Sequence, residues 1–232
     1  MLDPDCAQLP SPCIALFDLD GTLTWRDTLL PFLIGYALRH PSRLLRLWRW
    51  PKDLLGYVAG DRDRGRLKSK LIRAVMGGDP RSAVRGWAEA YVAGLTRRRV
   101  FRPAALAVLE AHRTRGDHLI LLSASPDLYV PHIGNLLGFE RTLCTELQWR
   151  PLPGGEDQLD GALRTPNRRG AEKSRCLAWL RTQYADLPVV AYGNSRSDLP
   201  HLRQADRALL VNGSSATRRA AGASGIPVAD WT

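Results

Sequence analysis

The apolar residues of this chain fall into short continuous runs that alternate with longer amphipathic segments. Four runs bounded by polar or turn-forming residues are typical of strands buried in a parallel sheet. These runs are residues 13–18, 118–123, 188–193 and 207–212. Helical periodicity lies between them, at residues 103–114, 126–137 and 171–185. The alternation predicts an α/β fold with an open parallel sheet, whose ligands bind at the carboxyl ends of the strands.

Residues 26–102 interrupt this alternation, because they carry helical periodicity and few strand signals. We expect them to form a helical cap domain over the strand ends, inserted into a core domain of residues 1–25 and 103–232. A shorter insertion at about residues 145–165 contains several turn-forming residues between alternating flanks, which predicts a β-hairpin.

Charge narrows the classes of partner. The chain of 232 residues has a net charge of +10, and only four of its 33 Lys and Arg residues are lysines. A basic surface suits nucleic acid, anionic lipid or phosphorylated substrates. The tryptophans are scattered from Trp25 to Trp231 and no nucleic-acid motif is present, so we do not expect nucleic-acid binding.

The cysteines predict a reducing compartment. The chain has four, with no CxxC pair and no accompanying histidine cluster, which is typical of reduced thiols in a cytoplasmic protein. The N-terminal residues are acidic and contain proline, unlike a secretory signal, and no apolar run reaches the length of a membrane span.

The strongest chemical signal is a pair of carboxylates at the end of the first predicted strand. Asp18 ends this strand, and Asp20 follows two residues later, where the chain turns at Gly21. Two carboxylates this close repel each other and can hold a divalent cation. One can attack an electrophile while the other transfers a proton.

Three further groups follow predicted strands or begin predicted helices. Ser123 ends the strand at 118–123, where its hydroxyl and nearby backbone N–H groups can hold a phosphate oxygen. Lys173 lies at a helix start, and Asn194 and Asp198 follow the strand at 188–193 as candidate Mg²⁺ ligands. Each alone also fits a helix cap or a solvated charge. Their order and placement together favour a phosphate site.

These segments resemble known motifs. FDLDGTLT (17–24), LLSAS (121–125), the Lys173 helix and GNSRSDL (193–199) are similar, in order, to the four motifs of the haloacid-dehalogenase (HAD) superfamily. The insertion after the first motif and the segment from residue 160 to Lys173 resemble its phosphoserine-phosphatase-like branch, subfamily IB. The resemblance covers nearly the whole chain and implies a HAD-like parallel sheet with a helical C1-type cap.

The resemblance also implies roles for individual residues. Asp18 would attack phosphorus and form an aspartyl-phosphate, and Asp20 would protonate the leaving oxygen and then deprotonate water. Mg²⁺ would be held by Asp18, Asp20, Asn194 and Asp198, while Ser123 and Lys173 would hold the phosphoryl group. The fourth motif commonly opens Gly-Asp, whereas this chain has Gly193-Asn194. We expect this asparagine to weaken the affinity for Mg²⁺ without removing activity.

The predicted cap carries a distinctive apolar and basic segment. Residues 29–38 are almost continuously apolar, and His40, Arg43, Arg46 and Arg49 follow among leucines and tryptophans, in a helix that we expect to end at Pro51. The leucines and tryptophans could form the cap core, with arginines in solvent. Alternatively, residues 29–58 could place the protein on the anionic inner face of a membrane, as in the phosphatidylglycerophosphatase C-like proteins that the segment resembles.

We therefore expect a Mg²⁺-dependent phosphatase acting on a phosphomonoester, with the lipid phosphatidylglycerophosphate as the favoured substrate. Arg66, Lys68 and Lys70 of the cap and Arg196 of the fourth motif could contact its anionic groups, although a solvated helix face suits the cap residues better. A soluble substrate such as phosphoserine is the alternative. A weakened HAD protein that binds phosphate or a membrane without turnover is a third hypothesis, motivated by Asn194.

Overall fold

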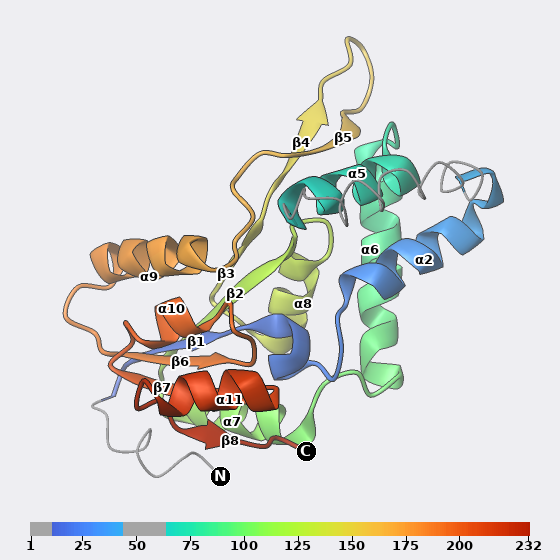
Figure 1. The fold of residues 1–232 in the computed structure, drawn as a ribbon. Coiled ribbons are helices and arrows are strands. Elements are labelled where there is room, and N and C mark those ends of the chain that lie inside the picture. Colours follow the sequence, from blue (N-terminus) through green and yellow to red (C-terminus); the bar gives the residue numbers. More distant parts are fainter. Residues whose placement is uncertain (1–10, 44–63) are drawn as a thin grey trace.

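The computed structural model describes residues 11–43 and 64–232. Its centre is a six-stranded sheet in which every pair of neighbouring strands is parallel. In spatial order the strands are β3 (Arg141–Thr145), β2 (His118–Pro126), β1 (Ile14–Phe17), β6 (Val189–Gly193), β7 (Arg207–Val211) and β8 (Val228–Ala229). The structure thus confirms the α/β fold with a parallel sheet (Figure 1).

Helices cover both faces of the sheet, because side chains alternate along each strand. Ala15 and Phe17 of β1 pack in one apolar layer with α7 (Pro103–Thr114) and α8 (Val130–Leu137). Ile14 and Leu16 pack in a second layer with α9 (Ala171–Gln183), α10 (Leu199–Leu202) and α11 (Ser215–Gly222). Burial on both faces explains why the central strands read as continuous apolar runs.

Two strands and one helix were not predicted from the pattern. β3 and β8 lie at the two edges of the sheet, and β3 begins with exposed and half-buried residues, so neither shows an apolar run. α11 is short and rich in alanine and arginine. The helix expected from residue 126 begins at Val130, because β2 continues to Pro126.

A second group of helices lies beside the sheet, after the short turn η1 (Leu19–Leu23) that follows β1. It contains α2 (Leu29–Arg39), α5 (Arg64–Met76) and α6 (Arg81–Arg97), next to the antiparallel hairpin of β4 (Leu147–Arg150) and β5 (Gln158–Leu163) (Figure 1). The hairpin agrees with the sequence and is joined to α5, where the Ser69 hydroxyl donates to the Gly161 carbonyl at 2.7 Å. The domain boundaries at residues 26 and 102 remain a prediction.

The apolar segment from residue 29 and the basic residues after it do not form one continuous helix, and the predicted end or kink at Pro51 lies outside the described residues. α2 ends at Arg39, because Pro41 disfavours helical backbone at His40, which has φ −125° and ψ 74°. The guanidinium of Arg43 turns inward, donates to the Gly77 carbonyl at 3.0 Å and pairs with Asp79. Arg43 therefore does not belong to an outward basic stripe, and Arg46 and Arg49 lie outside the described residues.

Membrane crossing was not expected from the sequence. Within residues 11–43 and 64–232, no helix combines the length and the apolar character that a span requires.

Candidate active site

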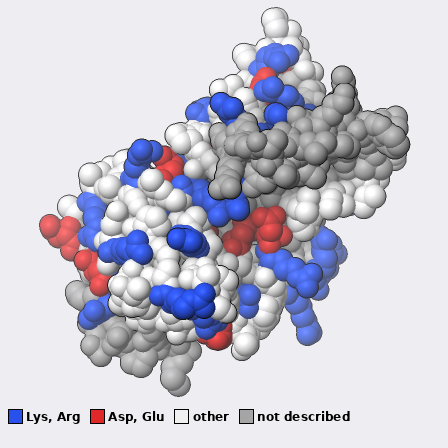
Figure 2. Space-filling view, viewed as in Figure 1, with Lys and Arg blue, Asp and Glu red and all other residues white. Residues whose placement is uncertain are grey.

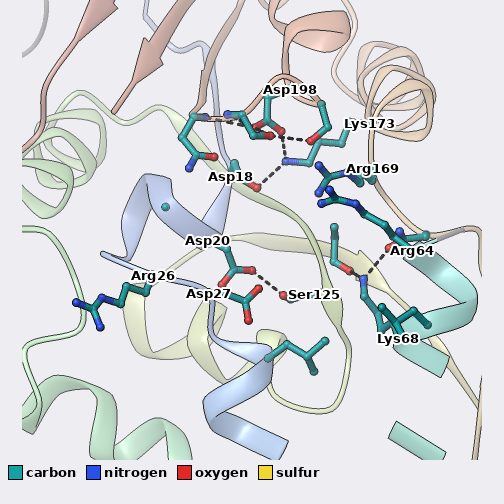
Figure 3. A pocket seen from close by; sticks show the side chains of 18 of the residues that line it. Asp18, Asp20, Arg26, Asp27, Arg64, Lys68, Ser125, Arg169, Lys173 and Asp198 are labelled. Carbon is teal, nitrogen blue, oxygen red and sulfur yellow. Dashed lines mark hydrogen bonds and ion pairs between the residues drawn. The ribbon is translucent and has the colours of Figure 1, made fainter. Parts of the chain in front are cut away.

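The carboxyl ends of β1, β2 and β6 meet at one cavity of about 770 Å³ between the sheet and the cap helices. Asp18 directly follows β1, and Asn194 and Asp198 follow β6, while Lys173 enters from the first turn of α9. Figure 3 shows the side chains of Asp18, Lys173 and Asp198 pointing toward one another. Asp18 and Asp198 are 180 positions apart in the chain. They line the same cavity because parallel strands end at the same edge of the sheet.

A buried lysine joins the two carboxylates. Lys173 is 2% exposed, and its Nζ lies 2.6 Å from Asp18 Oδ1 and 2.7 Å from Asp198 Oδ1. Burial opposes the charged ammonium, but attraction to both carboxylates outweighs it and raises the pKa of Lys173. Burial likewise opposes ionisation of Asp198, yet Lys173 and hydrogen bonds from Ser195 hold the pKa of Asp198 well below its ordinary value. Lys173 and Asp198 are therefore both charged at neutral pH.

Asp18 lies at the point of greatest negative charge. Burial raises its pKa to about 7, opposed by Lys173, and the charges of Asp198 and Asp20 add to the effect. Its Oδ2 accepts a hydrogen bond of 3.0 Å from the Thr22 hydroxyl, so the carboxylate is fixed at both oxygens. Two buried carboxylates, those of Asp18 and Asp198, share one ammonium here, and this excess of negative charge favours a bound cation.

Asp20 has a different environment. Its Oδ2 accepts from the Ser125 hydroxyl at 2.6 Å, and its Oδ1 accepts from the backbone N–H and the hydroxyl of Thr28, each at 2.7 Å. Burial and then the charge of Asp27 raise the pKa of Asp20 despite these hydrogen bonds. A carboxyl group with a raised pKa holds its proton more readily than an ordinary aspartic acid does, and this is the property that a general acid requires.

The donor set fits a divalent cation such as Mg²⁺, which prefers oxygen ligands. Asp18, Asp20 and Asn194 all line the cavity. The side chain of Asp20 is turned to Ser125 and Thr28, and both oxygens of Asp198 accept hydrogen bonds from Lys173 and from the loop at 194–195. In this arrangement both Asp198 oxygens already accept hydrogen bonds from the protein. Direct ligation of a metal by Asp198 stays a prediction.

Gly21 allows the loop after β1 and the loop after β6 to approach each other. It has φ +86°, and a Cβ at this position would lie 1.9 Å from the Nδ2 of Asn194. Any side chain here would displace Asn194 as well as strain the backbone.

We expect Gly21→Ala to lower the free energy of unfolding by about 1–3 kcal/mol and to reduce phosphatase activity, because it moves a cation ligand. Gly78→Ala is the matched control, since Gly78 has φ +85° and nothing within 4 Å of its added Cβ. Chemical unfolding and hydrolysis of an aryl phosphate measure the two effects. Equal loss of activity in both variants would contradict the role given to the approach of Gly21 and Asn194.

Four sequence-predicted side chains, those of Ser123, Arg66, Lys70 and Arg196, do not line this cavity. Ser123 is fully buried and its hydroxyl accepts from the Ser125 N–H at 3.0 Å, so Ser125 supplies the lining hydroxyl. Arg66 is exposed and lines a neighbouring cavity, and Arg196 is exposed on the loop after β6. The phosphate-binding role of Ser123 stays a prediction, and the substrate roles of Arg66 and Arg196 have no support in this geometry.

Lys68 does reach the cavity from the cap. Its Nζ donates to Asn167 Oδ1 at 2.6 Å and to the Ala124 carbonyl, so α5 contacts the core beside β2. Burial lowers the pKa of Lys68 to about 8. Lys70, its neighbour on α5, is exposed and lines the same neighbouring cavity as Arg66.

Several lining residues were missed in the sequence. They are Arg26, Asp27, Arg64, Ser125, Asn167 and Arg169. Asn167 and Arg169 lie in the segment that carries the resemblance to a family, so a signal for them was present. Figure 2 shows the result, a patch of acidic side chains with basic side chains on both sides. An anionic substrate would meet basic groups around a carboxylate-rich centre.

Comparison with known proteins places this arrangement in a family. The chain is 31% identical to protein CicA of Caulobacter vibrioides over 201 residues, which cover 84% of each chain. Its fold is similar to that of a Bordetella pertussis Tohama I protein of unknown function, with a TM-score of 0.79, 20% identity, and 96% and 100% of the two chains covered. It is also similar to a phosphoserine phosphatase solved as a phospho-aspartyl intermediate analogue, with a TM-score of 0.61, 15% identity, and 96% and 95% covered. The haloacid dehalogenase-like hydrolase family matches residues 15–203, and the chain belongs to this family.

Proposed function

We propose that this protein is a Mg²⁺-dependent phosphatase that hydrolyses a phosphomonoester through an aspartyl-phosphate on Asp18. The observation that carries the proposal is the position of the Asp18 carboxylate, which lines the cavity, is fixed by Lys173 and Thr22, and lies two residues from a second carboxylate with a raised pKa. The likeness in fold to the phospho-aspartyl phosphoserine phosphatase supports the same chemistry.

In the first step, an Asp18 oxygen attacks phosphorus, and the bond from phosphorus to the leaving oxygen breaks. Asp20 donates its proton to that oxygen, which leaves as an alcohol. Lys173 compensates negative charge on the transferring phosphoryl group and keeps Asp18 oriented. When bound, Mg²⁺ would be held by Asp18, Asn194 and the Asp20 backbone carbonyl, and it would reduce repulsion between the carboxylate and the phosphate.

In the second step, ionised Asp20 accepts a proton from water as the water oxygen attacks phosphorus. The bond between phosphorus and Asp18 breaks, inorganic phosphate leaves, and Asp18 returns as a carboxylate. The Ser125 and Thr28 hydrogen bonds hold Asp20 in place through both steps.

The substrate is a phosphomonoester whose leaving group faces the cap. Basic lining residues Arg26, Arg64, Lys68 and Arg169 support an anionic substrate. We favour a lipid phosphate such as phosphatidylglycerophosphate over a soluble metabolite such as phosphoserine. A screen of phosphate release from matched lipid and soluble phosphomonoesters tests this choice, and a preference for the soluble series would overturn it.

We expect Asn194→Asp to tighten Mg²⁺ binding by about three- to tenfold, because a carboxylate adds charge at the same reach as the amide. Isothermal titration calorimetry and the Mg²⁺ dependence of hydrolysis both report the change. Identical Mg²⁺ titrations of the two proteins would show that Asn194 is not a ligand. An inactive wild-type protein in which this variant restores turnover would favour the hypothesis of a weakened HAD protein.

A further inference from the structure

Helix α2 is apolar on both its sides, although only one side is packed against the protein. Phe32, Leu33, Tyr36 and Ala37 are buried against the other cap elements. On the opposite side, Leu30 is 53% exposed, Ile34 is 51% exposed and Leu38 is 66% exposed. The spacing of four residues places these three side chains in one line along the helix. A surface helix usually presents polar residues there.

We propose that this line of Leu30, Ile34 and Leu38, the α2 face, binds the surface of a membrane that contains anionic lipid. A helix that lies in the plane of the lipid headgroups buries such a face while its ends stay in water. The face begins one residue after Leu29, which lines the candidate active-site cavity. Binding through it would place the rim of the cavity near the membrane.

Charge favours lipid as the occupant over a second copy of this chain. Residues 28–52 contain five Arg and Lys residues and no Asp or Glu, and the whole chain has a net charge of +10. The carboxylate of Asp79 compensates the charge of Arg43. Arg39, at the end of α2, is exposed, and its guanidinium carbon lies 4.3 Å from the centre of the Trp87 ring. Two copies meeting through this region would bring like charges together, whereas anionic headgroups would compensate them.

Shape favours lipid over a folded protein partner. The α2 face is one line of three side chains on a convex helix, and its apolar area is on the order of a few hundred Å². Stable protein interfaces bury roughly 1,200–2,000 Å² in total. A fluid bilayer surface, in contrast, adapts to a single convex helix.

Co-sedimentation with vesicles tests the α2 face. The full-length protein is mixed with phosphatidylcholine vesicles and with vesicles that also contain phosphatidylglycerol. We expect binding to the anionic vesicles, weakened by salt, and a loss of at least about tenfold in partition coefficient for the triple variant Leu30→Gln/Ile34→Gln/Leu38→Gln. The matched control is Leu106→Gln/Leu136→Gln/Leu152→Gln, whose leucines are also exposed but lie on three separate elements. It should bind like wild type.

The outcomes separate the alternatives. Absence of wild-type binding, or equal binding by the α2 triple variant, would overturn the proposal. A change of oligomeric state in the triple variant with unchanged vesicle binding would assign the face to a second copy instead. If the triple variant does not fold, vesicle binding of the single variant Leu38→Gln, at the most exposed of the three positions, is measured instead. The proposal then requires that this variant bind more weakly than wild type. The assay contains no substrate, so an absence of vesicle binding would not contradict the proposed phosphatase activity.

Discussion

Asp18→Asn will lower kcat for an aryl phosphate by at least about a thousandfold, because the amide cannot form an aspartyl-phosphate. The variant should remain folded, since the amide oxygen can still accept the hydrogen bond from Lys173 and the amide N–H group can donate to the Thr22 hydroxyl oxygen. Hydrolysis of p-nitrophenyl phosphate in the presence of Mg²⁺ measures the loss.

The matched control for Asp18→Asn is Asp27→Asn. Asp27 lines the same cavity, but its Oδ1 accepts the Leu30 N–H at 3.0 Å, and in the proposed chemistry it acts only through its charge, which after burial is the second cause of the raised pKa of Asp20. An asparagine can keep this hydrogen bond. We expect Asp27→Asn to retain activity within about threefold of wild type. If the two variants lose activity equally, charge in the cavity and not a nucleophile at Asp18 explains the effect.

Lys173→Met will lower the free energy of unfolding by about 3–5 kcal/mol, because it leaves the buried carboxylates of Asp18 and Asp198 without their ammonium partner. It will also reduce turnover by at least about a hundredfold, since Lys173 stabilises charge on the phosphoryl group. Urea unfolding of the metal-free protein and aryl phosphate hydrolysis measure the two losses. Lys70→Met, at an exposed lysine on α5, should change neither by much.

The pH dependence of Lys173→Met follows from the two carboxylates. Without Lys173, the folded-state pKa of Asp198 rises above that of the unfolded chain, and the pKa of Asp18, already raised to about 7 in the wild type, rises further. A carboxyl group with a raised folded-state pKa destabilises the fold at high pH, and this penalty diminishes as the group takes up a proton. The stability difference between wild type and Lys173→Met should therefore narrow from about pH 8 to pH 5. A difference that is constant over this interval would contradict the account of two unpaired buried carboxylates.

The fold was predictable where burial dominates the sequence pattern. β1, β2, β6 and β7 are covered by helices on both faces, and their apolar runs fall within about three residues of the observed bounds. The edge strands β3 and β8 have no such pattern, because part of each is exposed. The end of α2 at Arg39 was predictable from Pro41, but this signal was missed.

The site was predictable where topology alone brings residues together. Asp18, Asn194 and Asp198 follow parallel strands, so their proximity follows from the fold. The cap residues depend on the rotation of α5 against the core, which the sequence does not define. For this reason Lys68 lines the cavity although a solvated helix face was preferred for it, while Arg66 lines a neighbouring cavity and Arg64 was missed. The inward ion pair of Arg43 was not predicted, because its partner Asp79 is 36 residues away in the chain.

Trapping the covalent intermediate tests the central claim most directly. The enzyme is mixed with substrate and Mg²⁺, quenched during turnover and treated with borohydride, which reduces an acyl phosphate to an alcohol. Peptide mass spectrometry then locates the reduced residue. The account predicts homoserine in place of aspartate at position 18 and nowhere else. Turnover with no reduced aspartate, or with the label at another carboxylate, would contradict it.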